Sequence, residues 1–335
     1  MYAGYTVCRI SCIRRPGIRA CERRPAGSAA GRKERKVKGI ILAAGRGTRL
    51  YPMTQPVCKP LLPVYDKPMI YYPLSILLQA GIRDILIITP PDDGLEAFER
   101  LLGDGSRFGV RIQYAVQTVA RGIADALIIG ESFAAGDRVC LVLGDNIFFS
   151  PDFRTQLQQA MANETGATVF GVYVEDPRPF GVVEFDDAGN VVSLEEKPAS
   201  PKTHYIVPGL YFYDSNAIEM AKALQPSARG ELEITDLNIA YMQRGELRVV
   251  LLDRDCVWLD AGTADSMLMA ALQIRHIQRQ YRMYVGCLEA LALEAGLISP
   301  ESCRQSGLAM EKTPYGQYLL RMAEQAEQKE QEAAE

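Results

Sequence analysis

The sequence contains little histidine and no run of apolar residues long enough to cross a bilayer. Only His204 and His276 occur among its 335 residues, so chemistry that needs several histidine ligands or a histidine base has little to draw on. The longest apolar stretch, MIYYPLSILLQAGI at 69–82, is shorter than the roughly 20 residues that a transmembrane helix needs, and it contains Pro73. It is typical of a core helix, and the sequence predicts no association with membranes.

No two of the cysteines form a C-x-x-C motif, and the net charge is small. The eight cysteines are scattered over Cys8, Cys12, Cys21, Cys58, Cys140, Cys256, Cys287 and Cys303. This distribution favours a reduced, cytoplasmic chain over a disulfide or zinc framework. The net charge of −4 argues against a nucleic-acid-binding protein.

Charge is nevertheless distributed unevenly along the chain. Eleven Lys and Arg against two Glu before Gly39 give +9, which leaves −13 for the rest. The segment is rich in Gly, Pro and Ala and has no periodic apolar pattern, which predicts a disordered basic tail over 1–37. It could be a transit-like segment, a region that binds anionic surfaces, or the product of a start assigned too far upstream. We favour the last, because no Met lies between Met1 and Met53 and a non-Met start near Val37 would precede the first strand.

From residue 38 onward, strand patterns alternate with helix patterns. Strands are expected at 38–43, 84–89, 111–115, 138–143, 166–174, 205–214, 247–252 and 256–259, and helices at 70–80, 94–102, 122–130, 153–163, 216–224, 233–243 and 264–281. A hairpin is expected over 180–198, around an Asp-Asp-Ala-Gly-Asn turn. The alternation predicts an α/β fold with a largely parallel mixed sheet between helices. We expect one catalytic domain over 38–322, with a helical extension from about 264, and a fraying helix end over 323–335.

The first predicted strand is followed by LAAGRGTRL, residues 42–50. Gly45 and Gly47 permit a loop whose backbone N–H groups could surround an anion, and Arg49 and Lys59 could bind phosphate oxygens. The G-x-G-x-x-G fingerprint fails at Leu50, and no P-loop motif occurs. The stretch favours phosphate binding, while a plain strand–helix turn with a surface arginine is the alternative.

Two aspartates follow apolar strands and precede small or polar residues. Asp145 lies in LVLGDNIFF and Asp260 in VWLDAGT. Two such carboxylates could share one hydrated Mg²⁺ that bridges substrate phosphates. Helix N-capping is the competing interpretation.

Further polar groups follow in EEKP and SARGELEITD. Lys197 could neutralise a phosphate and Glu196 could bind sugar hydroxyls, although an E-E-K sequence is more often a solvated surface. Arg229 lies beside Gly230 ahead of a predicted helix, where phosphate binding and an ordinary loop are equally good interpretations.

In order, the motifs LAAGRGTRL, KPLLPVYDKPMIYYPL, LGDNIF, FGVVEFD, SLEEKP, PSARGELEITD and WLDAGT closely resemble the glucose-1-phosphate thymidylyltransferases, which are bacterial sugar nucleotidyltransferases. The likeness extends from about Lys38 to about Met322. It implies a Rossmann-like three-layer α/β/α fold and the conversion of dTTP and α-D-glucose 1-phosphate to dTDP-glucose and pyrophosphate. It also implies Mg²⁺ as cofactor and, as is common in the family, a homotetramer.

The resemblance also implies roles for individual residues. Catalytic cations would be Arg49, Lys59 and Lys197, and the metal ligands Asp145 and Asp260. The nucleotide would be bound by Ala44, Gly45, Gly47, Thr48, Arg49, Lys59, Gln117, Gly122 and Asp145, with Gln117 and Gly122 reading the thymine edge. The sugar phosphate would be bound by Asn146, Gly181, Glu196, Lys197, Val207, Arg229 and Trp258.

The sequence departs from the family pattern at Ala44, Arg46, Pro60, Arg121, Asp125 and Phe180. Ala44 adds a methyl group near the nucleotide, and Pro60 removes a polar side chain there. Arg121 and Asp125 stand where the family usually has Asp and Gln around the base site. A uridylyltransferase or an enzyme that uses both dTTP and UTP is therefore the close alternative. A catalytically silent sugar-nucleotide sensor is a more distant one, against which the retained cations and carboxylates argue.

Overall fold

The computed structural model describes residues 36–91, 94–253 and 255–334, so nearly all of the predicted basic tail lies outside the described residues. The strands are β1 (Val37–Leu42), β2 (Pro63–Val64), β3 (Lys67–Pro68), β4 (Asp84–Thr89), β5 (Arg111–Val116), β6 (Arg138–Leu143), β7 (Asn146–Phe149), β8 (Ala167–Tyr173), β9 (Gly181–Phe185), β10 (Val191–Glu196), β11 (Tyr205–Val207), β12 (Leu210–Tyr213), β13 (Leu247–Leu251) and β14 (Val257–Asp260).

The helices are α1 (Tyr71–Gln79), α2 (Gly94–Leu102), α3 (Asp125–Ile129), α4 (Glu131–Ala134), α5 (Phe153–Ala162), α6 (Ala217–Ala223), α7 (Ile234–Gln243), α8 (Ala264–Tyr281), α9 (Leu288–Glu294), α10 (Pro300–Ala309) and α11 (Pro314–Ala334). Short 3₁₀ helices cover Thr48–Leu50, Lys59–Leu61 and Ser106–Phe108. None of the helices among the described residues is long and apolar enough to cross a membrane.

A ten-stranded mixed sheet forms the centre of this part of the chain. Its order is β10-β9-β11-β8-β12-β6-β1-β4-β5, and β13 pairs in parallel with β8. The strands β6, β1, β4 and β5 are all parallel, as the alternation of strands and helices predicts. The carboxyl ends of these strands therefore lie along one edge, and the loops after β1 and β6 are neighbours.

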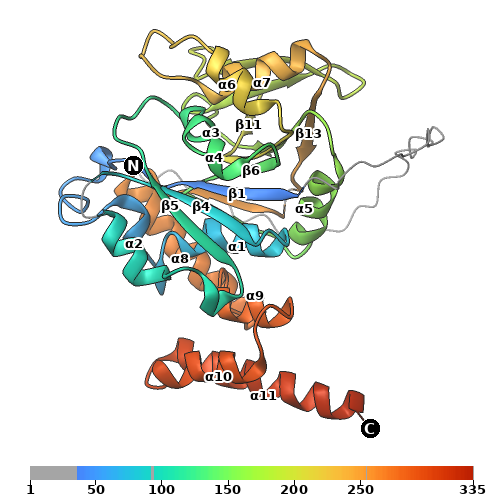
Figure 1. Cartoon of the computed structure of the whole chain (residues 1–335). Helices are drawn as coiled ribbons and strands as arrows, with labels where there is room; N and C mark the ends of the chain where they lie inside the picture. The colour runs from blue at the N-terminus through green and yellow to red at the C-terminus, as the bar shows by residue number, and fades with distance from the viewer. Residues whose placement is uncertain (1–35, 92–93, 254, 335) are drawn as a thin grey trace. The chain divides into compact units, whose positions relative to one another are not determined.

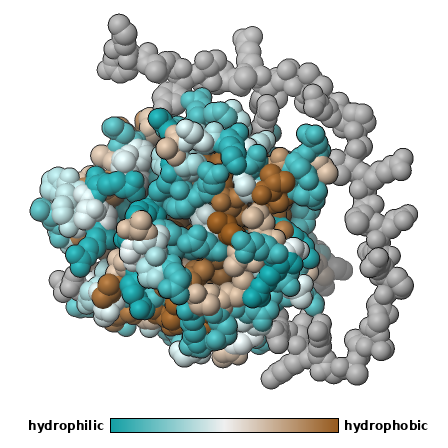
Figure 2. Space-filling view, turned by 90° about the horizontal axis from the view of Figure 1, so that it is seen from above, coloured by the Kyte–Doolittle hydropathy of each residue, from teal (hydrophilic) through white to brown (hydrophobic). Residues whose placement is uncertain are grey.

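Alternate residues of the strands face two different layers of helices (Figure 1). Ile41 packs in one cluster with residues of α1, α2, α5 and α9, whereas its neighbour Ile40 packs in another with residues of α3, α6 and α7. This arrangement follows from the two-residue period of a strand and explains why the strands are apolar on both faces. The face seen in Figure 2 is largely hydrophilic, with hydrophobic residues near its middle and further ones toward its lower left.

One predicted element is divided in the structure, and another is shorter than predicted. The strand expected over 205–214 is broken at Pro208 and Gly209 into β11, which pairs with β8 and β9, and β12, which pairs with β6 and β8. Pro208 has no N–H to donate to the sheet, and the Gly209 N–H donates instead to Asn146 Oδ1 at 3.0 Å. The helix expected over 122–130 begins only at Asp125, because Gly122 has a φ of +102°.

The chain after α8 continues in helices, as the sequence predicts. α9 packs against α1, while α10 and α11 pack on one another around Cys303, Leu319 and Ala323. The helix α11 continues through the segment expected to fray. The predicted hairpin is also present, as antiparallel β9 and β10.

Two glycines with similar backbone angles provide a test of the packing. Gly166 (φ +77°) precedes β8, and a Cβ there would lie 2.2 Å from the carbonyl oxygen of Glu246. Gly189 (φ +84°) lies in the β9–β10 turn, where a Cβ would meet nothing within 4 Å. We expect Gly166→Ala to lower the free energy of unfolding by about 3–4 kcal/mol, and Gly189→Ala by only the ~1–2 kcal/mol of the left-handed conformation. Urea unfolding measures both, and equal losses would contradict the packing at Gly166.

Candidate active site

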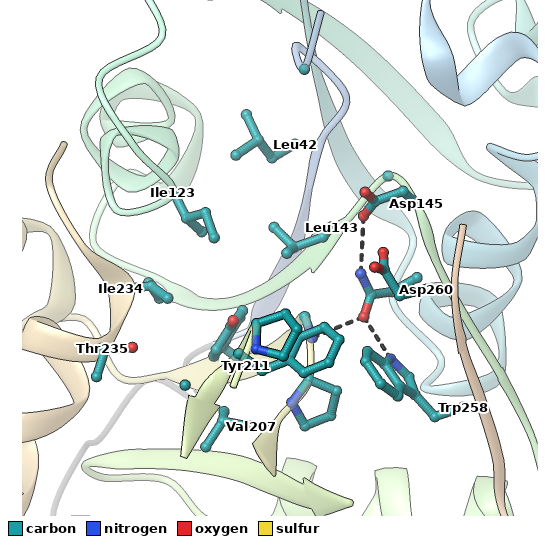
Figure 3. Close-up of a pocket in the computed structure, with 18 of the residues that line it drawn as sticks. Leu42, Ile123, Leu143, Asp145, Val207, Tyr211, Ile234, Thr235, Trp258 and Asp260 are labelled. Carbon is teal, nitrogen blue, oxygen red and sulfur yellow. Dashed lines mark hydrogen bonds between the residues drawn. The ribbon is translucent and has the colours of Figure 1, made fainter. Parts of the chain in front are cut away.

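One cavity of about 490 Å³ opens at the carboxyl edge of the sheet. Its lining comes from the loops after β1 and β6, from β9 to β12, from α7 and from β14. Figure 3 shows Ile123, Ile234 and Thr235 on one side and Asp145, Trp258 and Asp260 on the other, with Tyr211 and Val207 between them. Its volume is within the range of small-molecule sites in proteins.

The loop after β1 is folded so that Lys59 can approach it closely. Gly47 has a φ of +61°, and a Cβ at this position would lie 3.0 Å from the Cβ of Lys59 and 3.0 Å from Thr54 Cγ2. The Thr54 hydroxyl donates to the Gly47 carbonyl at 2.7 Å and fixes the turn. Gly45 lines the cavity, and a Cβ there would have nothing within 4 Å, so the backbone is open to a ligand. Glycine is therefore required at 47 by the fold.

Lys59 is buried, and its ammonium group forms an ion pair with the Asp145 carboxylate. Asp145 also accepts from Asn146 Nδ2 at 3.0 Å. The side-chain oxygen of Asn146 accepts from Trp258 Nε1 at 2.7 Å and from the Gly209 N–H (Figure 3). This network connects the end of β6 with β14 and with the break between β11 and β12.

Asp260 lies at the end of β14, opposite Asn146 on β7. Burial and the nearby charge of Asp145 raise the pKa of the Asp260 carboxyl to about 6, and Lys59 and Arg49 only partly oppose this effect. A further cation between these carboxylates would relieve their repulsion. Neither aspartate caps a helix, because β7 follows Asp145 and Thr263 caps α8.

The donor set fits Mg²⁺ better than a transition metal. No cluster of three or more His, Cys, Asp or Glu side chains suited to a metal occurs in the described part of the chain. Mg²⁺ is commonly bound by one or two carboxylates, with substrate phosphates and water completing its octahedron. Asp145 and Asp260 provide such a pair.

A second group of charges lies at the end of β10. Glu196 Oε2 accepts from the Thr235 hydroxyl at 2.6 Å, and Glu196 Oε1 lies 3.3 Å from Lys197 Nζ. Lys197 has a φ of +47°, which is unfavourable for a residue with a side chain, and its N–H donates to the Phe180 carbonyl at 3.0 Å. The strained backbone holds Lys197 against the cavity, beside a carboxylate that α7 fixes in place.

Eleven of the residues named from the sequence line this cavity: Gly45, Arg49, Lys59, Asp145, Asn146, Gly181, Glu196, Lys197, Val207, Trp258 and Asp260. Six others do not: Ala44, Gly47, Thr48, Gln117, Gly122 and Arg229. Arg229 instead forms a bidentate pair with Glu233, at 2.8 Å to each oxygen, and donates to Glu196 at 3.4 Å.

Two of the departures from the family pattern contact each other. Arg121 donates to Asp125 Oδ1 at 2.7 Å, while Gln117 Nε2 donates to Asp125 Oδ2 at 2.9 Å. Pro60 and Phe180 line the cavity, and the Phe180 ring packs edge-on against Trp258 at 5.1 Å.

Sequence reasoning missed several lining residues, among them Ile123, Leu143, Tyr211, Thr235 and Asn238. Ile234, Thr235 and Asn238 are spaced as one face of a helix, but that face could equally have belonged to the core. Tyr211 is buried in β12, and nothing in the strand pattern distinguishes it from Tyr213.

Comparisons with known proteins agree with this architecture. The nucleotidyl transferase family matches residues 38–277. The glucose-1-phosphate thymidylyltransferase of Neisseria gonorrhoeae is 55% identical over 85% of this chain and 99% of its own length. The enzymes of the same name from Xanthomonas campestris and Mycolicibacterium smegmatis are 53% and 50% identical, and cover 97% and 99% of their own lengths over 85% of this chain.

Solved structures give the same result. A crystal structure of a Bacillus anthracis protein described as a glucose-1-phosphate thymidylyltransferase, in complex with sucrose, is 44% identical. It matches with a TM-score of 0.67 over 72% of this chain and 96% of its own. A UDP-glucose pyrophosphorylase bound to UDP-glucose, at 21% identity and a TM-score of 0.63 over 72% of this chain and all of its own, shares the fold. The chain therefore belongs to the nucleotidyl transferase family, and it is an enzyme of the glucose-1-phosphate thymidylyltransferase group.

Proposed function

We propose that this enzyme transfers a thymidylyl group from dTTP to α-D-glucose 1-phosphate, giving dTDP-glucose and pyrophosphate. The observation that carries the proposal is the convergence of Arg49, Lys59 and Lys197 on one cavity that is also lined by three carboxylates, Asp145, Glu196 and Asp260. Three cations around one cavity suit a reaction between two anions, and the names of the curated relatives support the choice of substrates.

The sugar phosphate is itself the nucleophile, so the reaction needs no general base. One of its phosphate oxygens attacks the α-phosphorus of dTTP, a new P–O bond forms, and the bond from the α-phosphorus to the bridging oxygen breaks. Pyrophosphate leaves with that oxygen and the bonding electron pair. The protein must hold the two anions in line and stabilise the departing charge.

We assign the cations accordingly. Arg49, which is exposed at the loop after β1, would meet the departing pyrophosphate with its bidentate guanidinium group. Lys59, which is buried against Asp145, would act near the α-phosphate as a fixed point charge. Lys197 would bind the phosphate of the sugar. Ala44, Gly47 and Thr48 do not line the cavity, and they would act by shaping the loop whose backbone binds phosphate.

The sugar would lie between the ends of β9 to β12 and Trp258. Glu196 is held by Thr235 and could accept hydrogen bonds from two hydroxyl groups of the ring. Gly181, Val207 and Asn146 border the same space, and Trp258 provides an apolar surface with its indole fixed by Asn146. Arg229 would act through its contact with Glu196. Gln117 and Gly122 would meet the thymine edge.

Asp145 and Asp260 would hold Mg²⁺, which would neutralise the phosphates when bound. The raised pKa of Asp260 supports this assignment, because it reflects two carboxylates in a partly dry site that lack sufficient positive charge.

Pyrophosphate release is the decisive measurement. With glucose 1-phosphate and Mg²⁺, we expect turnover with dTTP at a kcat/KM at least about tenfold above that with UTP, and none after chelation of the metal. Turnover with UTP that is equal or faster would replace the proposal by a uridylyl or dual-specificity enzyme. Binding of dTTP without any turnover would identify a sensor.

Lys197→Ala tests the sugar-phosphate site. We expect the KM for glucose 1-phosphate to rise about 10- to 100-fold, which corresponds to a lost charge-assisted hydrogen bond of roughly 1.5–3 kcal/mol, while the KM for dTTP stays near that of the wild type. Lys202→Ala is the matched control, because Lys202 contacts Glu184 and Glu195 on the same hairpin outside the cavity. The chain has a single tryptophan, Trp258, so its fluorescence can report sugar-phosphate affinity directly. An unchanged affinity in Lys197→Ala would contradict this role.

We also propose that the enzyme assembles as a homotetramer. The helix α8 exposes Leu268, Met269 and Leu272 to 46–60%, an apolar surface that a second copy could cover. Light scattering should give four times the mass of the chain, and Leu268→Glu with Leu272→Glu should lower it. A monomeric wild type would contradict the assembly.

A further inference from the structure

Asp125 is a buried carboxylate with partners on both of its oxygens. Only 1% of its side chain is exposed. Oδ2 accepts from Gln117 Nε2 at 2.9 Å and Oδ1 from Arg121 at 2.7 Å. The Arg121 guanidinium is half exposed, so it can compensate the buried charge while remaining largely hydrated.

This contact determines which way the Gln117 amide points. An ionised carboxylate can only accept hydrogen bonds, so the NH₂ group of Gln117 must face Asp125, and the opposite orientation would place two oxygens together. The amide oxygen is thereby directed away from Asp125. It accepts no hydrogen bond from the described residues, and it is not among their fully buried unpaired atoms, so solvent or a ligand can reach it.

Gln117, Arg121 and Asp125 lie at the same sheet edge as the cavity. Gln117 directly follows β5, and its N–H donates to the Thr89 carbonyl at the end of β4 at 2.9 Å. Ile123, two residues before Asp125, lines the cavity. The backbone of Gly122 packs closely on Leu232, because a Cβ at 122 would lie 2.4 Å from the carbonyl oxygen of Leu232. This contact fixes the segment between Gln117 and Asp125.

We propose that Asp125 is a positioning residue that fixes the Gln117 amide oxygen toward the nucleobase, and that the site thereby selects a base whose edge has a ring N–H beside a carbonyl. The inference rests on the proposed function, in which Gln117 meets the base. Arg121 donates to the other oxygen of Asp125, so both carboxylate oxygens act as acceptors.

The chemical consequence is discrimination between pyrimidines. Thymine and uracil present an N3–H donor beside the O4 acceptor, which match the oxygen and the remaining N–H of the fixed amide. Cytosine presents an N3 acceptor beside an N4 amino donor, so in the same position it needs the amide reversed. Asp125 thus excludes cytosine nucleotides, whereas it cannot separate dTTP from UTP, whose base edges are alike.

Equilibrium binding of dTTP and dCTP by calorimetry in the presence of Mg²⁺ tests the inference without any need for turnover. We expect wild type to favour dTTP by at least about tenfold. Asp125→Asn, whose amide can accept or donate, should let Gln117 reverse and lower that ratio to about threefold or less, with the affinity for glucose 1-phosphate unchanged. If Asp125→Asn does not fold, Asp125→Ser takes its place, because its hydroxyl also accepts and donates.

Asp84→Asn is the matched control. Asp84 accepts from Arg111 Nε at 2.6 Å. These two residues are the first of β4 and β5, so they lie at the ends of the strands far from Gln117. The control should keep the wild-type ratio. A wild type that binds dTTP and dCTP equally, a variant at 125 that keeps the ratio, or a control that loses it would each overturn the inference. Selective binding of dTTP without pyrophosphate release would leave it standing while the proposed function failed.

Discussion

The site depends on the balance of opposite charges around a partly buried cavity. Lys59 and Asp145 form an ion pair there. The negative charge of Asp145 repels that of the second carboxylate, Asp260. Such a group is stable only when each charge has a fixed partner. The surrounding hydrogen bonds supply that order: Asn146 donates to Asp145 and accepts from Trp258 and from the backbone at Gly209. In the proposed reaction, the positive charge of a metal and the negative charge of phosphates would enter a site that is already organised.

The sequence predicts the part of this site that local rules determine. Strand periodicity locates the ends of β1, β6 and β14, and parallel pairing brings the first two to one edge, so these rules are enough to identify Gly45 and Asp145 as neighbours. The face of α7 that carries Thr235 and Asn238 is not recognisable in this way, because it faces the cavity only through long-range packing. The break at Pro208 and Gly209 has the same origin, since it places an N–H against a side chain 63 residues away.

The unusual residues at 121 and 125 show that departures from a pattern can be compensated by one another. Taken singly, Arg121 would add a charge near the base site, and Asp125 would bury one. In the structure each accounts for the other, and the buried carboxylate retains a hydrogen bond to Gln117. The two positions are only four residues apart, so the Arg121 side chain reaches the first residue of α3 and forms an ion pair with it.

Lys197 is the residue of the site whose backbone conformation is least explained by the chain around it. Of the non-glycine residues with positive φ in the described ranges, Tyr65 occupies the tight β2–β3 turn, and Ala135 and Arg282 end helices. All three are positions where such angles recur for reasons of chain geometry. Lys197 follows a strand and has no such reason, yet its N–H is bonded to Phe180 and its ammonium group lies beside Glu196. The cost of that conformation, roughly 1–2 kcal/mol, is opposed by these contacts, which hold the residue at the cavity. The strain therefore supports the role proposed for Lys197.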